Sequence, residues 1–248
     1  MDLLNQFIDI EKHVNGIYKG DCLKGIERIA DESIDLGVTD PPYGINYYSN
    51  RSKDDKYRGK VKSVDGIKND KNNIDFLEKV AKGFYRILKN NTHLYWFTRW
   101  DKVEEQKPML EEIGFKVKNN IIWMKNNWSM GDLKGSYAGQ YECILFCHKG
   151  RRELNEVDGK KRHSDILTFD RIPVNRLLHS HQKPTELIEL LIKKSSDENE
   201  IVFDPFMGSG TTAVAAKSSN RKFIGFELDE DYYKKAKERI SDEVAQRV

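Results

Sequence analysis

A strand, a glycine turn and a helix follow one another directly in residues 201–218, and this order strongly constrains the fold. Residues 201–204 are apolar and strand-like, Gly208 and Gly210 lie in the turn, and a helix is predicted over 211–218. Glycine lacks a Cβ atom, so the backbone can turn sharply and a ligand can approach closely. The helix presents free N–H groups and its positive dipole end at the turn. The unit favours a nucleotide-like ligand here, with a purely structural turn as the alternative.

Strand-like and helix-like segments alternate along the rest of the chain as well. Strands are predicted over residues 17–19, 33–39, 93–98, 117–124, 141–147, 201–204 and 222–227. Helices are predicted over residues 23–30, 74–88, 103–113, 184–194, 211–218 and 231–240. Strands separated by helices predict one α/β domain over residues 1–248, with a mainly parallel sheet and helices on both of its faces.

The charge balance does not identify a partner. The 248 residues include 42 Lys and Arg against 40 Asp and Glu, so the net charge is only +2 and any basic surface must be local. The longest apolar run, 143–147, is far shorter than the roughly 20 residues of a membrane-spanning helix. The N-terminus lacks the pattern of a signal peptide, and the three cysteines include no Cys-x-x-Cys pair. We therefore expect a cytoplasmic protein without disulfides or membrane contact.

An acidic residue ends the strand that follows the glycine turn. Glu227 is placed to accept hydrogen bonds from ribose hydroxyls. The third glycine of the dinucleotide fingerprint is replaced by Thr212 and Ala213. This replacement favours a smaller nucleoside ligand over a dinucleotide.

A second motif, Asp40-Pro41-Pro42-Tyr43, follows the strand predicted at 33–39. The two prolines fix φ and remove two N–H donors, which holds backbone carbonyls rigidly beside a carboxylate and an aromatic ring. Such a set suits a planar amino group. A proline turn after a strand, where Asp and Tyr are common, is an equally good reading of these residues alone.

Together the two motifs resemble those of the DNA amino-methyltransferases, which use S-adenosylmethionine. Asp40–Tyr43 is similar to the catalytic signature of that family, and Asp204–Thr212 is similar to its cofactor loop. Shorter matches occur in the expected order at Gly20-Asp21-Cys22, Gln182-Lys183-Pro184 and Ile224–Glu227. The order resembles the β arrangement of the family. The resemblance covers residues 17–48 and 74–240, and it implies a Rossmann-like methyltransferase fold with a small, loop-built target-recognition region.

The resemblance also implies a set of cofactor-binding residues. They are Asp21, Cys22, Lys183, Asp204, Phe206, Gly208, Ser209, Gly210, Thr211 and Glu227. Glu227 would hold the ribose, Asp21 would accept from the adenine amino group, and Lys183 would lie near the cofactor carboxylate. Plainer alternatives stay open. Lys183 could be a solvated residue at a helix start, Cys22 a small buried hydrophobe, and Asp21 the cap of the helix that follows it.

The catalytic residues implied are Asp40, Pro41, Pro42 and Tyr43. The carboxylate of Asp40 and the carbonyl of Pro41 would accept hydrogen bonds from the exocyclic amine, and Tyr43 would stack on the flipped base. Transfer would be direct, with neither a metal nor a covalent intermediate. Asp at the first motif position favours N6 of adenine. N4 of cytosine, an amine in RNA or protein, and a non-catalytic DNA- or nucleotide-binding module are the alternatives.

Two polar stretches are predicted to contact DNA phosphates. Residues 51–71 form a basic loop after the catalytic motif, and residues 149–182 form a short target-recognition insertion. The candidate side chains are Arg51, Lys53, Lys56, Arg58, Arg151, Arg152, Lys160 and Lys161. Either stretch could also be an ordinary solvated loop. Because little chain is left for recognition, a homodimer sharing the DNA is a hypothesis, and a companion restriction endonuclease is a further candidate partner.

Overall fold

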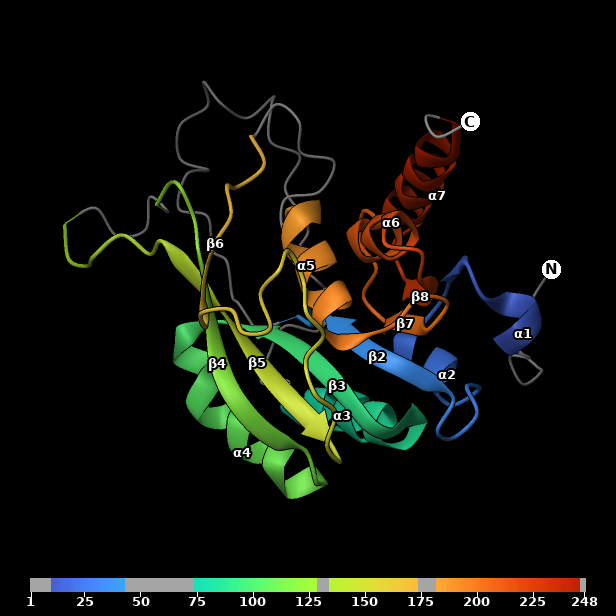
Figure 1. The fold of residues 1–248 in the computed structure, drawn as a ribbon, viewed down its shortest axis with the longest axis horizontal. Helices are drawn as coiled ribbons and strands as arrows, with labels where there is room; N and C mark the ends of the chain where they lie inside the picture. The colour runs from blue at the N-terminus through green and yellow to red at the C-terminus, as the bar shows by residue number, and fades with distance from the viewer. Residues whose placement is uncertain (1–9, 43–73, 129–133, 174–181, 246–248) are drawn as a thin grey trace, which may run out of the picture.

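A computed structural model gives the fold, and it describes residues 10–42, 74–128, 134–173 and 182–245. Within these residues the strands form one eight-stranded sheet in the order β1–β8–β7–β2–β3–β5–β4–β6 (Figure 1). The strands are β1 Gly16–Lys19, β2 Ile34–Thr39, β3 Leu88–Thr98, β4 Lys116–Met124, β5 Tyr141–Lys149, β6 Ile166–Thr168, β7 Ile201–Asp204 and β8 Lys222–Glu227. Only β5 runs against its neighbours, β3 and β4, and the other neighbouring pairs are parallel. The mainly parallel sheet predicted from the sequence is therefore confirmed.

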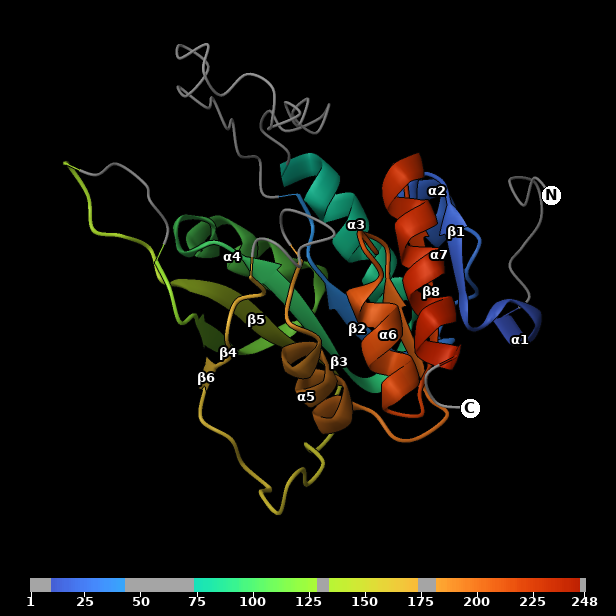
Figure 2. The same cartoon turned by 90° about the horizontal axis from the view of Figure 1, so that it is seen from above.

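Helices cover both faces of the sheet. They are α1 Ile10–His13, α2 Cys22–Ile26, α3 Ile74–Ile87, the 3₁₀ turn η4 Trp100–Lys102, α4 Val103–Ile113, α5 Thr185–Ser195, α6 Thr211–Ser218 and α7 Glu230–Ala245. Figures 1 and 2 show α3 and α4 on one side of the sheet and α5 and α6 on the other. This layering buries the central strands, of which β2 is buried along its whole length, whereas most residues of β4 are not buried.

Two apolar cores follow from the alternation of side chains along the strands. On β3, Leu94 and Trp96 join the core under α3 and α4. Their neighbours Tyr95 and Phe97 join the core under α5 and α6. Strand β2 is buried along its whole length because both of its faces are covered.

Some elements differ from the sequence prediction. Helix α2 ends at Ile26, four residues early, because the backbone continues in tight turns in which Ile29 N donates to Ile26 O at 3.0 Å. These turns bury Ile29 completely. Strand β3 begins at Leu88, five residues before its predicted start, since Leu88 pairs with Ile34 of β2. Strand β6 is only three residues long, too short for its apolar pattern to be recognised.

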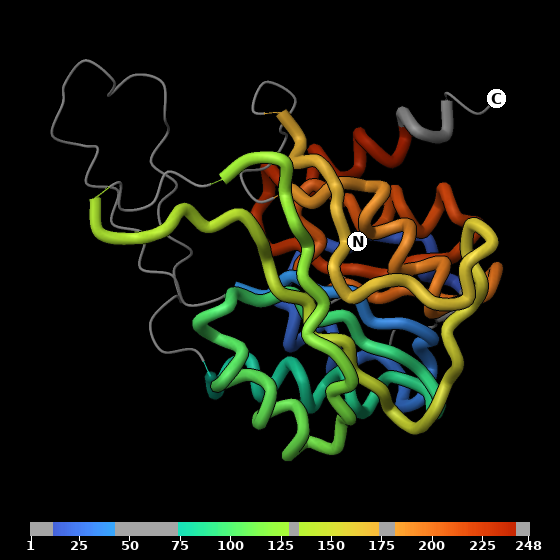
Figure 3. Tube along the Cα trace, turned by 60° about the vertical axis from the view of Figure 1, so that its left-hand side comes forward, coloured from blue at the N-terminus to red at the C-terminus, as the bar shows by residue number. Residues whose placement is uncertain are grey.

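The carboxyl ends of β2 and β7 meet at one edge of the sheet. The two strands are paired in parallel, with Leu36 opposite Val202. After β2 the chain continues through α3 to β3, whereas after β7 it continues through α6 to β8, so the connections leave in opposite directions. Ligands of α/β proteins bind in the crevice at such a switch point. Figure 3 shows residues 134–140, which lead into β5, extending away from the sheet.

Candidate active site

The turn after β7 is braced from within by Asp204. Its Oδ1 accepts from the backbone N of Phe206 at 3.0 Å, and its Oδ2 accepts from Oγ1 of Thr212 at 2.6 Å. The carboxyl group is buried, and this burial raises the pKa of Asp204 to about 7. Both oxygens thus support the turn. Asp204 therefore braces the turn from within, and its contact with the cofactor stays a prediction.

The glycines of the turn take backbone conformations that other residues rarely adopt. Gly208 has φ 53° and Gly210 has φ 80°. A Cβ atom on Gly210 would lie 3.1 Å from the Cβ of Ala236 on α7. Met207 N donates to Phe226 O at 2.9 Å, which ties the turn to β8. A bare backbone is therefore presented at the start of α6, as the sequence predicts.

Arg239 of α7 fixes the same turn from the other side. Its Nη1 donates to Oγ1 of Thr211 at 2.9 Å and to the carbonyl of Ser209 at 3.3 Å. Its Nη2 donates to Oγ1 of Thr185 at 2.9 Å, at the start of α5. The sequence gives no signal for this, since Arg239 lies in a polar helix among other charged residues. Phe206, also predicted to line the pocket, lies edge-on to Phe76 with 6.0 Å between ring centroids.

Glu227 ends β8 beside the glycine turn. Its Oε2 accepts from Gly208 N at 2.7 Å and its Oε1 from Asp229 N at 2.8 Å. Burial raises the pKa of this carboxyl group. A carboxylate has about four acceptor positions, so these two bonds leave capacity for ribose hydroxyls.

The neighbouring strand β1 brings Asp21 and Cys22 to the same edge. Gly20 N donates to the carbonyl of Glu227 at 2.9 Å, so the two strand ends are level. Asp21 caps α2, with its Oδ1 accepting from Lys24 N at 3.0 Å. Cys22 is buried in the core, and burial raises the pKa of its thiol to about 12. Asp21 is thus a helix cap and Cys22 a small buried residue, as the plainer alternatives predict. Oδ2 of Asp21 accepts no hydrogen bond from the described residues.

Asp40 ends β2 and forms an ion pair with Lys183. Oδ2 of Asp40 lies 2.6 Å from the Nζ atom of Lys183, which also lies 2.9 Å from Oε2 of Glu142. Glu142 in turn pairs with Lys125 through Oε1 at 2.6 Å. The ammonium group of Lys183 rests 5.2 Å from the centre of the Phe97 ring. Two cations and two carboxylates thus form one compact, electrically balanced cluster at the strand edge.

Burial and charge act in opposite directions on this cluster. Burial disfavours the charged form of Lys183, but Asp40 and Glu142 outweigh it and raise the pKa of the lysine above its ordinary value. Burial also opposes the charge of Glu142, yet Lys183 and Lys125 lower its pKa to about 2. The ammonium group is therefore committed to two protein carboxylates. The expected position of Lys183 near the carboxylate of the cofactor stays a prediction.

Sequence reasoning missed Glu142 and Lys125. The only local signal is a single carboxylate near the start of an otherwise apolar strand, Tyr141–Lys149. Nothing in that pattern indicates that β5 runs beside β3 and so delivers Glu142 to the Asp40 edge. Thr39 and Thr98 end the adjacent strands with buried hydroxyl groups that have no hydrogen-bond partner among the described residues. Such groups at a strand edge fit a site that receives a polar ligand.

The predicted DNA contacts fall into two groups. Tyr43, Arg51, Lys53, Lys56 and Arg58 lie outside the described residues, as does the whole loop 51–71. Arg151, Arg152, Lys160 and Lys161 follow β5, whose direction carries them to the edge of the sheet opposite Asp40. Arg152 is occupied by Asp197 and Glu200, both at 2.9 Å. Because β5 is antiparallel, these four side chains lie toward the edge of the sheet opposite the catalytic motif, and their contact with DNA stays a prediction.

The residues around the glycine turn fit a nucleoside that also carries an amino-acid chain. Glu227 can accept from ribose, Asp21 can accept from a base amine, and the bare backbone of Gly208 and Gly210 lets a chain lie close. Asp40 and the Pro41 carbonyl stand at the neighbouring strand end, as acceptors for a second amine. No helix in the described ranges is long and apolar enough to cross a membrane.

Comparisons with known proteins agree with this geometry. The model of a family described as DNA methylase, N6_N4_Mtase, matches residues 34–238. The chain is 30% identical over 248 residues to the type II methyltransferase M2.LlaDCHI of Lactococcus lactis subsp. cremoris, covering 93% of this chain and 91% of that protein. The solved structure of an M1.HpyAVI–SAM complex matches with a TM-score of 0.68 and 26% identity, covering 90% of this chain and 98% of the other. The cytosine-N4-specific PvuII DNA methyltransferase shares the fold, with a TM-score of 0.69 and 17% identity over 93% of this chain and 91% of that one.

Proposed function

Because the chain belongs to the DNA methylase family of N6 and N4 amino-methyltransferases, we propose that it transfers a methyl group from S-adenosylmethionine to N6 of adenine in DNA. The observation that carries the proposal is the pairing of β2 with β7. It brings the carboxylate of Asp40 and the glycine turn of residues 205–210 to the same crevice. A methyl donor held at the glycine turn and a target amine held at Asp40 would then face each other.

The cofactor would be held by the turn and by the two strand ends beside it. Gly208, Ser209 and Gly210 would lie against its methionine part, Glu227 would accept from the ribose, and Asp21 would accept from the adenine. When bound, S-adenosylmethionine supplies an electrophilic methyl group on a positively charged sulfur. Asp204, Thr212 and Arg239 would support this pocket from behind by fixing the turn.

The protein's own contribution to the reaction is position. An aromatic amine is a poor nucleophile because its lone pair is conjugated with the ring. Hydrogen bonds from its N–H groups to Asp40 and to the Pro41 carbonyl would favour a pyramidal nitrogen whose lone pair points away from these acceptors. Lys183 would fix the direction of the Asp40 carboxylate. Holding two reactants in such an arrangement can contribute roughly 7–11 kcal/mol to lowering the barrier.

Target choice is the finer part of the proposal. Asp rather than Ser at the first motif position supports adenine, whereas the fold is shared with a cytosine-N4 enzyme. Both amines need the same two acceptors, so cytosine N4 is the second candidate.

The deciding experiment supplies methyl-labelled cofactor and DNA, digests the product to nucleosides and separates them. Label in N6-methyl-2′-deoxyadenosine is expected, and label in N4-methyl-2′-deoxycytidine would overturn the target assignment. An Asp40→Ala variant should lose transfer by at least 100-fold while it still binds the cofactor. Transfer to RNA and not to DNA would overturn the substrate class as well.

The partners of the enzyme follow from the same reading. Type II methyltransferases among its relatives support a companion restriction endonuclease that cleaves the same unmethylated sequence. A homodimer on the DNA is a prediction, which light scattering with and without duplex would check. Sequencing methylated DNA from cells that express the chain would give the recognition sequence.

A further inference from the structure

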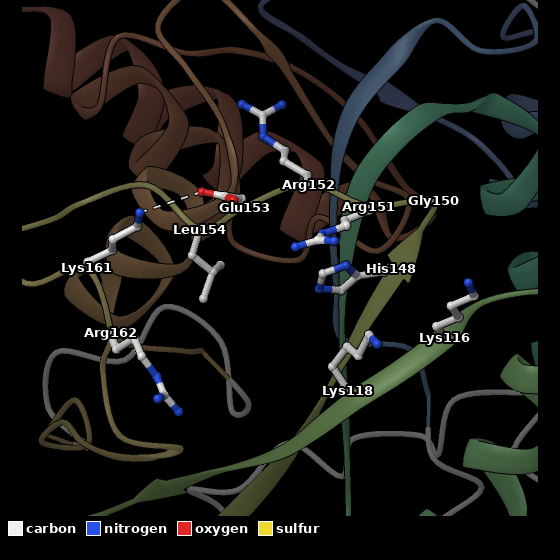
Figure 4. Close-up of a pocket in the computed structure, with 10 residues that line it drawn as sticks. All are labelled: Lys116, Lys118, His148, Gly150, Arg151, Arg152, Glu153, Leu154, Lys161 and Arg162. Carbon is white, nitrogen blue, oxygen red and sulfur yellow. Dashed lines mark ion pairs between the residues drawn. The ribbon is translucent and has the colours of Figure 1, made fainter.

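A hollow of about 570 Å³ lies at the opposite edge of the sheet from Asp40. Its walls come from the start of β4, the end of β5 and the loop that returns to β6. The lining residues are Lys116, Lys118, His148, Gly150, Arg151, Arg152, Glu153, Leu154, Lys161 and Arg162 (Figure 4). Figure 4 shows basic side chains on both sides of this hollow.

The cations of this hollow are largely unbalanced. In the described part of the chain, the side chains of Lys116, Lys118, Arg151 and Arg162 make no ion pair with a carboxylate. The single acidic lining residue, Glu153, lies 3.7 Å from Lys161. Like charges that line one hollow repel each other, so their arrangement favours an anionic partner.

The hollow is built on fixed backbone. Lys116 pairs with His148 across β4 and β5. Arg151 N donates to Oδ1 of Asn91 at 2.9 Å, and the carbonyl of Arg152 bonds to Nε2 of His93 at 3.1 Å. These bonds hold the start of the loop against the sheet before any ligand arrives.

His148 lies close to the positive charges of the hollow. Its Nδ1 atom is buried and has no hydrogen-bond partner among the described residues. Burial lowers the pKa of this imidazole, and the positive charges of Lys118 and Lys116 lower it further. These effects disfavour the charged form of the histidine, so the positive field of the hollow comes mainly from its lysine and arginine side chains.

The lining also indicates which anion fits. Leu154 is the one aliphatic side chain among the lining residues, and no Phe, Tyr or Trp is among them, so the wall offers little apolar surface to enclose a base. Sites for small nucleotides are lined mainly by hydrophobic and aromatic residues with a few polar groups, whereas six of the ten residues that line this hollow are Lys or Arg. Phosphates of a nucleic-acid backbone need only cations of suitable spacing.

We propose that this hollow binds the phosphodiester backbone of a second DNA segment, separate from the one that delivers a base to Asp40. On β3, Trp96 lies beside the end of β2 and His93 lies beside His148 of the hollow. These two residues are three positions apart on the strand, and the hollow lies beyond His93. The walls open where β5 ends, away from the crevice of β2 and β7. The proposal rests on the proposed function only in taking DNA as the substrate.

The test compares two double variants with the same change of charge. Lys116→Glu with Lys118→Glu reverses two exposed cations of the hollow. Lys79→Glu with Lys107→Glu does the same on the outer surfaces of α3 and α4 and serves as the control. DNA binding is measured by fluorescence anisotropy on a labelled 60-base-pair duplex over a range of salt concentrations.

Each lost phosphate contact should reduce the slope of log affinity against log salt by about 0.9. The hollow variant is therefore expected to have a slope smaller by about 2 and to bind at least tenfold more weakly at low salt than the control. Wild type should also hold two differently labelled short duplexes at once, seen as energy transfer, and the hollow variant should hold one.

Equal binding by the two double variants, or one duplex on wild type, would overturn the proposal. Tripolyphosphate that binds wild type but not the hollow variant, without duplex competing for it, would show a small-anion site and would also overturn it. Loss of cofactor affinity is the folding check, and neither variant should show it. Wild type that binds two duplexes but never methylates DNA would refute the proposed function and leave this site standing.

Discussion

The Nζ atom of Lys183 lies 2.6 Å from Oδ2 of Asp40, within a cluster that also contains Glu142. This contact joins the segment before α5 to the end of β2, across the crevice at the switch point. A charged group fixed by two ion pairs inside the protein has little freedom to move. Lys183, rather than solvent, therefore fixes the direction of the Asp40 carboxylate, which is proposed to accept hydrogen bonds from the amine.

Replacing Lys183 with methionine should therefore damage both stability and activity. Asp40 and Glu142 would face each other without their shared cation, and removing one partner of a buried ion pair typically costs about 3–5 kcal/mol. We expect a lower midpoint of urea unfolding and at least a 100-fold loss of methyl transfer.

A second variant separates the two effects. Adding Glu142→Gln to Lys183→Met removes one of the stranded carboxylates, so stability should partly recover while activity stays low. A Lys183→Met protein that unfolds like wild type would contradict the buried pairing.

Gly225 should not tolerate a methyl group. A Cβ atom there would lie 2.0 Å from Cε of Met207 and 2.6 Å from the backbone oxygen of Asp204. The methionine can move, but the oxygen belongs to the strand that carries the glycine turn. We expect Gly225→Ala to cost about 1–3 kcal/mol of unfolding free energy and to weaken cofactor binding.

Gly20 offers a matched control at the same sheet edge, because a Cβ atom on it would meet nothing within 4 Å. Gly20→Ala should leave unfolding and cofactor binding close to wild type. Equal behaviour of the two variants would show that the close approach at Gly225 is not a constraint.

The buried carboxyl group of Asp204 should give the protein a specific pH dependence. Its pKa of about 7 in the folded protein exceeds the ordinary value of 3.8, so between these pH values the folded state holds a proton that the unfolded chain has released. The stability from this group is complete below about pH 4 and is lost as the pH rises through 7.

Asp204→Asn keeps an acceptor for Phe206 N but cannot titrate. Relative to this variant, wild type should lose stability from pH 5 to pH 7 by at most about 1.4 kcal/mol per pH unit. Urea titrations at several pH values measure the difference, and parallel curves for the two proteins would refute the buried, titrating carboxyl group.

Arg239 should affect cofactor affinity without touching the reacting atoms. Arg239→Met removes the hydrogen bonds to Ser209, Thr211 and Thr185, and bonds to a charged donor contribute about 1.5–3 kcal/mol each. We expect calorimetry to give at least tenfold weaker cofactor binding, with a smaller change in kcat. Lys237→Met, two residues earlier on the same helix, is the control and should bind normally.

Most elements of the fold could be predicted because their signals are local. The apolar spacing of α3 and the capping glycine of α4 lie within single segments, and both helices begin and end within a residue of the prediction. The direction of β5 could not be predicted in this way. It depends on pairing between β3 and residues that lie about 50 positions later in the chain, and strand pairing of this kind is decided by the whole sheet.

The residues of the candidate site also differ in whether local sequence signals could identify them. Asp40, Gly208, Gly210 and Glu227 could be located because each stands where a predicted strand or turn ends. The partners of Lys183 could not, since Glu142 reaches it only through the reversed strand. The same reversal takes Arg151 and its basic neighbours away from the catalytic motif. Charge along the sequence identified these side chains, but only the strand order shows which edge they serve.

The pairing of β2 with β7 also has a consequence for how the chain is made. Ile201 N, at the start of β7, donates to the carboxylate of Asp35 on β2, 166 residues earlier. During synthesis β2 therefore leaves the ribosome long before its neighbour β7 exists, and until then one backbone edge of β2 has no strand to pair with. Contacts between such distant residues fold slowly and leave strand edges exposed. The cofactor cannot stabilise the nascent chain at this stage, because the glycine turn that would bind it is synthesised after β7. This architecture therefore predicts that β2 completes its pairing in the sheet only after β7 has been synthesised.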